Sequence, residues 1–597
     1  MKSMILRACT ALFFMAIVVA VAYTVPHPSQ TAITASALTS PAFAHQQTVA
    51  QLLEPTPLPE ADVVSPTDST DPTPATLIEL SPILYQQNAL AVVNFKATWG
   101  NKSANIATMT DYIYEADAQG AQMIVFPEMA LIGYSANSDS ETWDYQMPVA
   151  YAETTAGTTA TTFSALAQEL DLWIIYGGTE TYSSTQAYNA AFICSPDGSV
   201  ETYRKIAPVE GDWCLAGSAP LVIDAGDLGR IGIGICYDTY SHPELGEYYT
   251  SQGCDLYVNL TASSVNYSAD NEDAWLWYYT SRLESLAAQS GLYVASANLV
   301  GSCGGYVFPG GSAFVTPNTA MEVTTGEEGI VYNQAMDDLP SLTINATTYS
   351  QWYADIAATS YNPKYSYTSA KSPTVYLADT TATLVSTIHQ AGAQGVDILL
   401  YPSEDFITQP IPGTTTRTLS NYAVTYEMYI LFTMTEILDS GEEVDAVAIL
   451  SPDGTITSHQ VDSPVILDTP WGSLGVALGD ELYNNPLLSR YYGAMGCKGM
   501  LHIGFTAPTT WQLETILGVY GSRDGLAIAT CTPTQSHLVT IFHNQSGDQA
   551  INWETGAAVD WTAVTEPTLW NLEDTGFSIT YFNAERSAQW FDSGAES

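Results

Sequence analysis

Short apolar runs alternate with segments of helical spacing along most of the chain. Residues 88–95 (NALAVVNF) are predicted to form a strand, residues 101–118 a helix, and residues 122–127 (QMIVFP) a second, buried strand. This order is typical of an α/β fold. Two Ser-Pro-Asp-Gly sequences, at residues 195–198 and 451–454, predict hairpin turns between antiparallel strands. We therefore expect mixed sheets in an α/β layer structure, with two sheets stacked between outer helices.

The same pattern occurs twice. ADAQGAQMIVFPE at residues 116–128 corresponds to AGAQGVDILLYPSE at residues 391–404, and the two Ser-Pro-Asp-Gly turns correspond in the same order. Conserved order between the two halves favours a duplication over chance similarity. The Tyr/Ser/Thr-rich residues 346–372 are the predicted linker between the halves.

The N-terminal residues are typical of an export signal. Lys2 and Arg7 precede an uncharged apolar stretch, residues 11–25, and a small-residue site ends at Ala44. Residues 1–44 are therefore predicted to be a signal peptide or an uncleaved membrane anchor, which places the protein outside the cell or on its surface. The Pro/Thr-rich residues 45–83 are predicted to be an extended tether. The expected domains are residues 84–345 and 373–597.

The composition and net charge of the chain disfavour several classes of binding partner. The chain has 597 residues, 46% of them apolar, so it can bury large cores. Its 15 Lys and Arg against 63 Asp and Glu give a net charge of −48, which disfavours binding to nucleic acid or to anionic membranes. Membrane contact is expected only through an uncleaved N-terminal segment. The histidines show no metal-ligand spacing and there is no phosphate-binding Gly loop, so no metal or nucleotide cofactor is implied.

Three residues of the first half form a candidate catalytic set. Glu128, Lys205 and Cys236 each follow or end a predicted strand, where α/β folds gather their chemistry. A thiolate is a strong nucleophile, a buried carboxylate can take its proton, and an ammonium group can stabilise an oxyanion. Each residue also has an ordinary structural explanation: a loop cap, a solvated hairpin charge and a small buried hydrophobic side chain, respectively.

Together these residues carry a family resemblance. FPEMALIGY at residues 126–134, YRK at residues 203–205 and GIGICYD at residues 232–238 resemble the motifs of the carbon-nitrogen hydrolase, or nitrilase, superfamily. The resemblance covers about residues 84–339. It implies an αββα subunit that pairs into an αββα–αββα dimer and acts on amides or nitriles without a metal or organic cofactor.

The resemblance also implies roles for individual residues. Cys236 corresponds to the nucleophile, Glu128 to the general base and then acid, and Lys205 to the cation that stabilises the intermediate. The backbone N–H of Tyr237 corresponds to an oxyanion-hole donor. Glu210 resembles an additional Glu that orients the triad, although its shorter spacing from Lys205 leaves a loop carboxylate as the alternative.

The substrate pocket is less specified. Aromatic residues near the motifs are expected to shape it, together with the loop at residues 263–275: Tyr134, Trp213, Tyr237 and Tyr240. Tyr240 stands where Arg is common in the family, which leaves the substrate class open.

In the second half the internal alignment places Ser403, Val461 and Gly479 opposite the three candidate residues. We therefore expect a non-catalytic nitrilase-like domain there, which forms an internal pseudo-dimer with the first half and leaves room for higher oligomers. The leading hypothesis is a secreted, cysteine-dependent amidase that cleaves a small linear amide through a thioester. The alternatives are an N-acyltransferase of the same superfamily and a non-catalytic exported binding protein.

Overall fold

The computed structural model describes residues 86–137, 139–264, 272–317, 319–323, 325–335, 342, 344, 346–358, 372–403, 407–541, 559–570 and 572. All of them belong to one unit, Leu80–Ser597. The predicted signal and Pro/Thr-rich segment, residues 1–83, lie outside the described residues. Within the described part, no helix is both long enough and apolar enough to cross a bilayer.

Two mixed sheets form the centre of the first half. The first contains, in spatial order, β13 (Gly329–Tyr332), β1 (Leu90–Asn94), β2 (Met123–Val125), β3 (Trp173–Thr181), β4 (Ala187–Cys194) and β5 (Val200–Arg204). The second contains β12 (Ala313–Val315), β9 (Tyr293–Asn298), β8 (Leu256–Thr261), β7 (Arg230–Ile235) and β6 (Val222–Asp224). Strands β1 to β3 and β7 to β9 run parallel, and the strands on either side of each group are antiparallel, as expected of mixed sheets.

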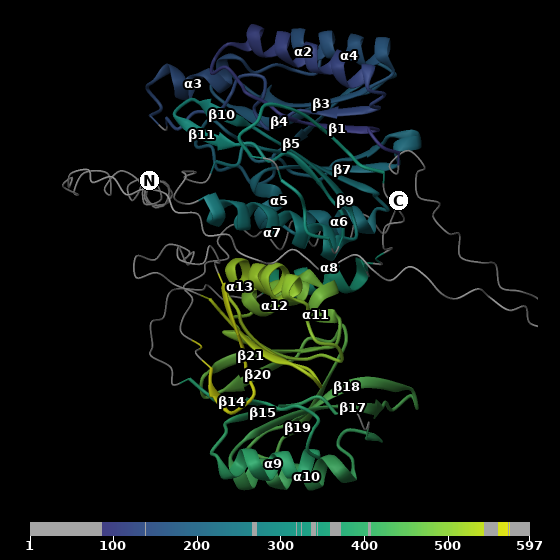
Figure 1. Ribbon diagram of the computed structural model, residues 1–597, viewed down its shortest axis with the longest axis vertical. Helices are drawn as coiled ribbons and strands as arrows, with labels where there is room; N and C mark the ends of the chain where they lie inside the picture. Colours follow the sequence, from purple (N-terminus) through teal and green to yellow (C-terminus); the bar gives the residue numbers. More distant parts are fainter. Residues whose placement is uncertain are drawn as a thin grey trace, which may run out of the picture. The chain divides into compact units, whose positions relative to one another are not determined.

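Helices cover the outer faces of these sheets (Figure 1). The helices of the first half are α2 (Lys102–Ala118), α3 (Trp143–Ala150), α4 (Thr158–Leu170), the 3-10 turn η2 (Gly226–Leu228), α5 (Tyr237–Ser241), α6 (Glu244–Ser251) and α7 (Glu272–Ser290). Met109 and Ile113 of α2 pack onto the first sheet, and Val92 and Val125 face the second sheet. The layers are therefore helix, sheet, sheet, helix. A separate hairpin, β10 (Val300–Cys303) with β11 (Tyr306–Pro309), completes this half.

The second half repeats this arrangement of strands. Its first sheet contains β19 (Ile456–Gln460), β18 (Glu443–Leu450), β17 (Tyr429–Ile437), β15 (Ile398–Tyr401), β14 (Thr374–Leu377) and β26 (Thr568–Leu569), with β16 (Thr408–Gln409) beside β17. Its other sheet contains β20 (Ile466–Thr469), β21 (Gly472–Leu478), β22 (Gly499–Ile503), β23 (Ala527–Cys531), β24 (Ser536–Ile541) and β25 (Val559–Ala563). The second Ser-Pro-Asp-Gly turn joins β18 to β19, as the first joins β4 to β5.

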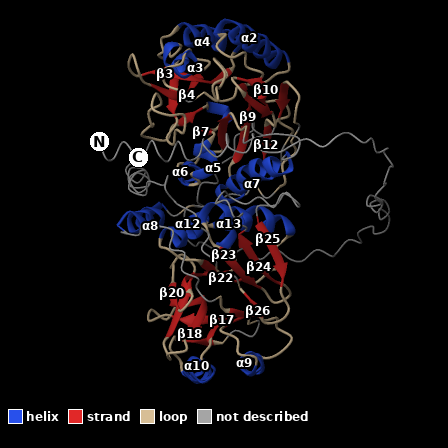
Figure 2. Ribbon diagram, turned by 90° about the vertical axis from the view of Figure 1, so that its left-hand side faces the viewer, coloured by secondary structure: helices blue, strands red, loops and turns tan. Residues whose placement is uncertain are grey.

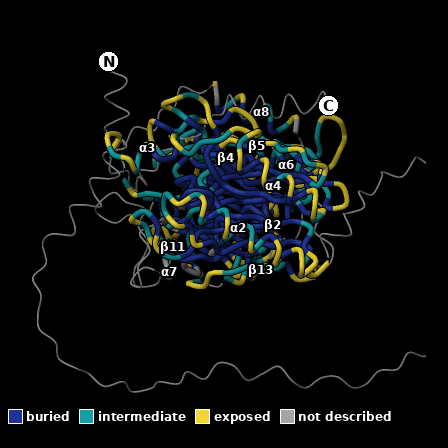
Figure 3. The backbone as a smooth tube through the Cα atoms, turned by 90° about the horizontal axis from the view of Figure 1, so that it is seen from above, coloured by how far each residue is buried: buried dark blue, intermediate teal, exposed yellow. Residues whose placement is uncertain are grey.

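Helices also flank the sheets of the second half (Figure 2). They are α9 (Leu384–Ala393), α10 (Thr414–Tyr426), α11 (Glu481–Asn484), α12 (Pro486–Ala494), the π-helical η3 (Gln512–Leu517) and α13 (Gly518–Asp524). In both halves most of the buried residues lie on the apolar strands. Seen from above, buried residues occupy the centre and exposed residues the periphery (Figure 3). An apolar layer between the sheets therefore orders each half.

The segment expected to link the halves contains a helix, α8 (Ala346–Ala358). Tyr349, Trp352, Tyr353 and Ile356 are buried in one cluster with residues of α12 and η3. Their spacing of three, four and seven residues places them on one face of a helix. An aromatic stripe thus anchors part of the segment that was predicted to be a linker.

Candidate active site

Glu128 lies just beyond the carboxyl end of β2, where its side chain is only 1% exposed. The backbone here passes very close to β3. A Cβ atom at Gly177 would lie 2.4 Å from the carbonyl oxygen of Pro127 and 2.6 Å from the Cα of Glu128. Only glycine fits such an approach, so Gly177 lets β3 lie directly beneath the segment that carries Glu128.

Lys205 follows β5 directly, and its side chain is completely buried. Its amide donates to the carbonyl oxygen of Asn189 at 2.9 Å, and its own carbonyl accepts from the amide of Gly217 at 2.7 Å. These backbone bonds fix the point from which the side chain enters the core. The Nζ atom then donates to Oε1 of Glu128 at 2.7 Å and also contacts Oε1 of Glu210. One ammonium group therefore lies between two carboxylates.

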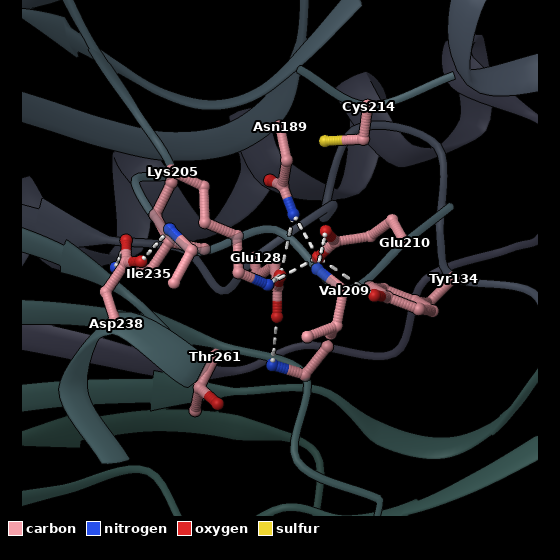
Figure 4. Close-up of polar contacts among 12 residues, drawn as sticks. Glu128, Tyr134, Asn189, Lys205, Val209, Glu210, Cys214, Ile235, Asp238 and Thr261 are labelled. Atoms are coloured by element: carbon pink, nitrogen blue, oxygen red, sulfur yellow. Dashed lines mark hydrogen bonds and ion pairs between the residues drawn. The ribbon is translucent and has the colours of Figure 1, made fainter. Parts of the chain in front are cut away.

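Asn189 of β4 joins the same two carboxylates (Figure 4). Its Nδ2 donates to Oε1 of Glu128 at 2.7 Å and to Oε1 of Glu210 at 2.9 Å. Glu210 also accepts from the Tyr134 hydroxyl at 3.1 Å and from the Val209 amide at 2.8 Å. With 2% of its side chain exposed, Glu210 belongs to this buried cluster and is not a solvated loop charge.

The two glutamates differ in pKa. Burial raises the pKa of Glu128, and the opposing Lys205 charge does not fully compensate, so this pKa lies above its usual value. Burial also acts on Glu210, but the charge and hydrogen bond of Lys205 outweigh it and lower the pKa. Burial disfavours the Lys205 ammonium, yet the two carboxylates hold its pKa well above the usual range. Glu210 is thus the permanent counter-ion of Lys205, and Glu128 is the group suited to exchange a proton.

Cys236 directly follows β7 in an unusual backbone conformation, with φ 49° and ψ −100°. Its amide donates to the carbonyl oxygen of Leu260 at 2.9 Å. The amide of Ala262, just past β8, donates to Oε2 of Glu128 at 2.9 Å, and the charges of Glu128 and Lys205 both act on the pKa of the Cys236 thiol. The structure therefore brings the thiol to the Glu128 and Lys205 cluster.

The thiol is protonated at rest. Burial raises the pKa of Cys236 to about 12, and the Glu128 charge adds to this, against smaller opposing effects of Lys205, Thr261 and Ala262. A nucleophilic role then requires a neighbouring base, because little thiolate exists at neutral pH. Glu128 is the carboxylate whose charge acts on this thiol. The cysteines of the described residues are all free thiols.

Asp238 connects the Cys236 turn to the Lys205 segment, and its role was missed in the sequence. Its carboxylate accepts from the Tyr203 hydroxyl at 2.8 Å and from the amide of Ala207 at 2.7 Å, on either side of Lys205. It also accepts from the amide of Ile235 at 3.3 Å. Asp238 thereby ties the end of β7 to the end of β5. Asn189 was missed as well, although a polar residue within the apolar run AYNAAFIC was a signal for it.

The residues predicted to shape the pocket lie in different surroundings. Tyr134 contacts Glu210, and Tyr237 begins α5 with its ring 6.0 Å from that of His242. Tyr240 is buried, and its hydroxyl lies 2.8 Å from that of Thr261. Trp213, by contrast, is 6% exposed within the hydrophobic cluster that packs beneath the outer helices.

The predicted loop at residues 263–275 is described only at its ends. Residues 265–271 lie outside the described part, and Trp275 belongs to α7. Trp275 is 2% exposed, and its Nε1 donates to Oγ of Ser263 at 3.1 Å. This side chain is therefore held in the core. Among the described residues, no group of three or more His, Cys, Asp and Glu side chains is arranged to hold a metal ion.

In the second half, different side chains stand at the corresponding strand ends. Ser403 follows Pro402 beyond β15, Val461 follows β19 directly, and Gly479 follows β21 directly. Val461 is 51% exposed, whereas Lys205 is fully buried. The thiol and the ammonium group of the first half therefore have no counterpart at these three positions.

Comparison with known proteins places the first half in a family. The carbon-nitrogen hydrolase family model matches residues 89–336. The omega-amidase of Homo sapiens is 30% identical over 252 residues, which cover 39% of this chain and 83% of that protein. The chain belongs to the carbon-nitrogen hydrolase family.

Two further matches cover a similar share of this carbon-nitrogen hydrolase. A nitrilase of Pyrococcus abyssi is 26% identical over 229 residues, or 38% of this chain and 80% of the relative. A solved structure of a mutant amidase of the nitrilase superfamily from Nesterenkonia is 20% identical, covers 42% of this chain and 89% of its own, and has a TM-score of 0.36. The family match ends at residue 336, so the second half lies outside it.

Proposed function

We propose that this chain hydrolyses a linear amide through a thioester on Cys236. The carrying observation is the buried cluster in which Glu128 accepts from Lys205 and from the Ala262 amide, while the charges of Glu128 and Lys205 both act on the Cys236 thiol. A nucleophile, a base of raised pKa and a buried cation therefore meet at one point. The names of the relatives, omega-amidase and amidase, support an amide as substrate.

The reaction proceeds in two displacements. Glu128 accepts the proton of the Cys236 thiol as the sulfur attacks the amide carbonyl carbon. Lys205 and the backbone N–H of Tyr237 stabilise the oxyanion, the C–N bond breaks, and Glu128 returns the proton to the leaving amine. Water then attacks the thioester with Glu128 as base. The acid leaves, and the proton on Glu128 passes to the released thiolate.

Ammonia release from a panel of primary amides, including propionamide and succinamate, tests this function. The wild-type chain is expected to release ammonia and free acid from at least one of them. Intact-mass spectrometry of the wild-type chain, quenched during turnover of its slowest amide, is expected to find the acyl group on Cys236, because the thioester accumulates when water attacks it slowly. The matched control is Cys236→Ala, which should show no adduct.

Two outcomes would contradict the proposal. One is a folded wild-type chain that releases no ammonia from any amide of the panel. The other is an adduct that persists in Cys236→Ala. Acylated methylamine as the main product in the presence of methylamine would instead favour acyl transfer over hydrolysis.

Replacing Glu210 by Gln is expected to move the acid limb of the kcat/KM profile to lower pH. The charge of Glu210 raises the pKa of Glu128, and Glu210 shares the Lys205 ammonium with it. Without Glu210, the Glu128 carboxylate has the cation to itself and remains ionised in more acidic solution. Because the base form of Glu128 is the active one, activity persists further into acid.

The matched control for this shift is Tyr134→Phe, which removes one hydrogen bond to Glu210 but no charge. Its acid limb should stay close to that of the wild type. An acid limb that is unmoved in Glu210→Gln, or displaced to higher pH, would show that Glu128 is not the group whose ionisation limits the rate.

We also propose that the protein is exported and that its second half is a non-catalytic nitrilase-like domain. Export is supported by the charged and apolar pattern of residues 1–44. A lack of catalysis in the second half is supported by Ser403, Val461 and Gly479 at the three strand ends. The halves form an internal pseudo-dimer in this proposal, with the helices of the second half as the partner surface of the first.

A further inference from the structure

Polar and apolar contacts join the two halves along their inner helices. Ala288 of α7 belongs to the same buried cluster as Tyr353 of α8 and Leu517 of η3. Trp511 donates from Nε1 to Oε2 of Glu284 in α7 at 2.8 Å. The second half therefore meets the helices that cover the sheet from which Cys236 emerges.

One contact reaches the segment that follows the nucleophile. Arg490 of α12 is 4% exposed and donates from Nη2 to the carbonyl oxygen of Ser241 at 2.5 Å. Ser241 is the last residue of α5, the helix that begins immediately after Cys236. The Nη1 atom of Arg490 also lies 4.0 Å from Oε2 of Glu244, at the start of α6. A guanidinium of the second half thus faces both ends of the α5–α6 junction.

Helix α5 needs outside support to keep its place. It has only five residues, and so short a helix is unstable without tertiary contacts. The carbonyl groups of its last turn have no partners within the helix. Asp238 holds its first turn to the Lys205 segment through the amide of Ala207. Arg490 supplies the corresponding bond at its last residue, and that bond comes from the other half of the chain.

The backbone at Cys236 makes this support matter. A non-glycine residue with φ 49° and ψ −100° is strained, and such a conformation persists only where the surroundings enforce it.

The ionisation of Glu244 also depends on Arg490. Burial alone would raise the pKa of Glu244, but the charges of His242 and Arg490 outweigh burial and lower this pKa to about 2. The buried carboxylate is therefore ionised beside the guanidinium.

We infer that Arg490 is a positioning residue for Cys236: the second half holds α5 in place and with it the sulfur of the first half. Within the second half, Oδ1 of Asp524 lies 3.9 Å from Nε of Arg490 and adds a negative charge beside the guanidinium. This role rests on the proposed hydrolysis at Cys236. It gives the second half a function that requires no catalytic residue of its own.

The test compares full-length Arg490→Met and Arg490→Lys with the wild type. In Arg490→Met, kcat for the best amide of the panel is expected to fall by about tenfold to a hundredfold, with KM changed by less than about threefold. Arg490→Lys keeps the cation beside Glu244 and should recover part of the loss. The alkylation rate of Cys236 by iodoacetamide, followed by peptide mass spectrometry across pH, should change in the same order, because it reports the placement of the sulfur directly.

The matched control is Trp511→Phe, which breaks a hydrogen bond between the halves at α7 but leaves α5 untouched. Its kcat and alkylation rate should stay near those of the wild type. Equal values in folded Arg490→Met and the wild type would overturn the inference, as would an equal loss in Trp511→Phe. If Arg490→Met does not fold, Arg490→Lys decides: wild-type kcat and alkylation in that variant would also overturn it.

The alkylation measurement separates this inference from the proposed function. It needs no amide substrate, so it gives an answer even if the wild-type chain releases no ammonia. If the wild-type chain releases no ammonia but Cys236 is alkylated more slowly in the Arg490 variants, the positioning role is supported and the proposed amide hydrolysis is ruled out. If the wild-type chain hydrolyses amides but Cys236 is alkylated at the wild-type rate in the Arg490 variants, the proposed function is supported and the positioning role is overturned.

Discussion

Replacing Lys205 by Met is expected to lower kcat by about a thousandfold, the scale seen when a preorganised oxyanion donor is removed. The structure gives a second reason for a large effect. Lys205 is the shared ion-pair partner of Glu128 and Glu210, and all three side chains are nearly or fully buried. Breaking a buried ion pair on one side typically costs about 3–5 kcal/mol, so the free energy of unfolding should fall by about that amount near neutral pH.

The stability loss in Lys205→Met should depend on pH with a definite sign. Without the ammonium group, burial and mutual repulsion raise the folded-state pKa of the two carboxyl groups above the unfolded value of about 4.3. Below that value both states are protonated and the penalty is small. It grows as the pH rises above the unfolded value and levels off once the pH exceeds the folded-state pKa. Thermal unfolding at about pH 4 should therefore show a smaller gap between variant and wild type than at about pH 7.5.

Lys102→Met is the matched control for this variant. Lys102, the first residue of α2, pairs with Glu153, and 16% and 12% of the two side chains are exposed. Its loss should leave kcat unchanged and cost less stability. A Lys205→Met variant with wild-type kcat would show that the ammonium group does not stabilise the reacting oxygen.

The sequence predicted the elements that depend on short-range pattern. The strands before Glu128 and Cys236 are apolar runs, the strand before Lys205 follows a Ser-Pro-Asp-Gly turn, and the structure has strands ending at these points. The two Ser-Pro-Asp-Gly turns predicted antiparallel pairs, which are present in both halves. Periodicity and turn chemistry are local, so one sequence was enough to find them.

The contacts that hold the site could not be predicted in this way, because their partners are distant in sequence. Asn189 bonds to Glu128 across 61 positions, and Arg490 bonds to Ser241 across 249. No local pattern fixes which loop meets which strand. The sequence also could not show that Trp213, near Glu210 along the chain, packs its ring in a buried hydrophobic cluster. Burial of an aromatic ring is worth about 2–3 kcal/mol, enough to decide where such a side chain lies.

Replacing Cys236 by Ala is expected to abolish turnover and leave the fold intact, because the sulfur is the proposed nucleophile and Ala removes one atom from a buried site. Replacing it by Gly should abolish turnover equally. Ammonia release and circular dichroism of the two variants check both statements. Substantial activity in Cys236→Ala would rule out a thioester on this residue.

The two variants should differ in stability, with Cys236→Gly the more stable by about 1 kcal/mol. Ala keeps the Cβ atom and therefore the strain of φ 49° and ψ −100°, which costs about 1–3 kcal/mol. Gly removes that strain, and the greater conformational entropy of its unfolded chain costs only about 0.4–1 kcal/mol of stability. The second half has Gly479 at its corresponding turn, also at positive φ, 59°.

Urea unfolding of both variants measures this difference, and Ala104→Gly in α2 is the control. In a helix the same Ala-to-Gly change should destabilise the protein by about 1 kcal/mol, the opposite sign. A Cys236→Ala variant as stable as Cys236→Gly would mean that the turn is not strained. A more stable Cys236→Gly would mean that the first half keeps a strained cysteine at this turn and loses stability by doing so. The second half has glycine at the corresponding turn and avoids that strain.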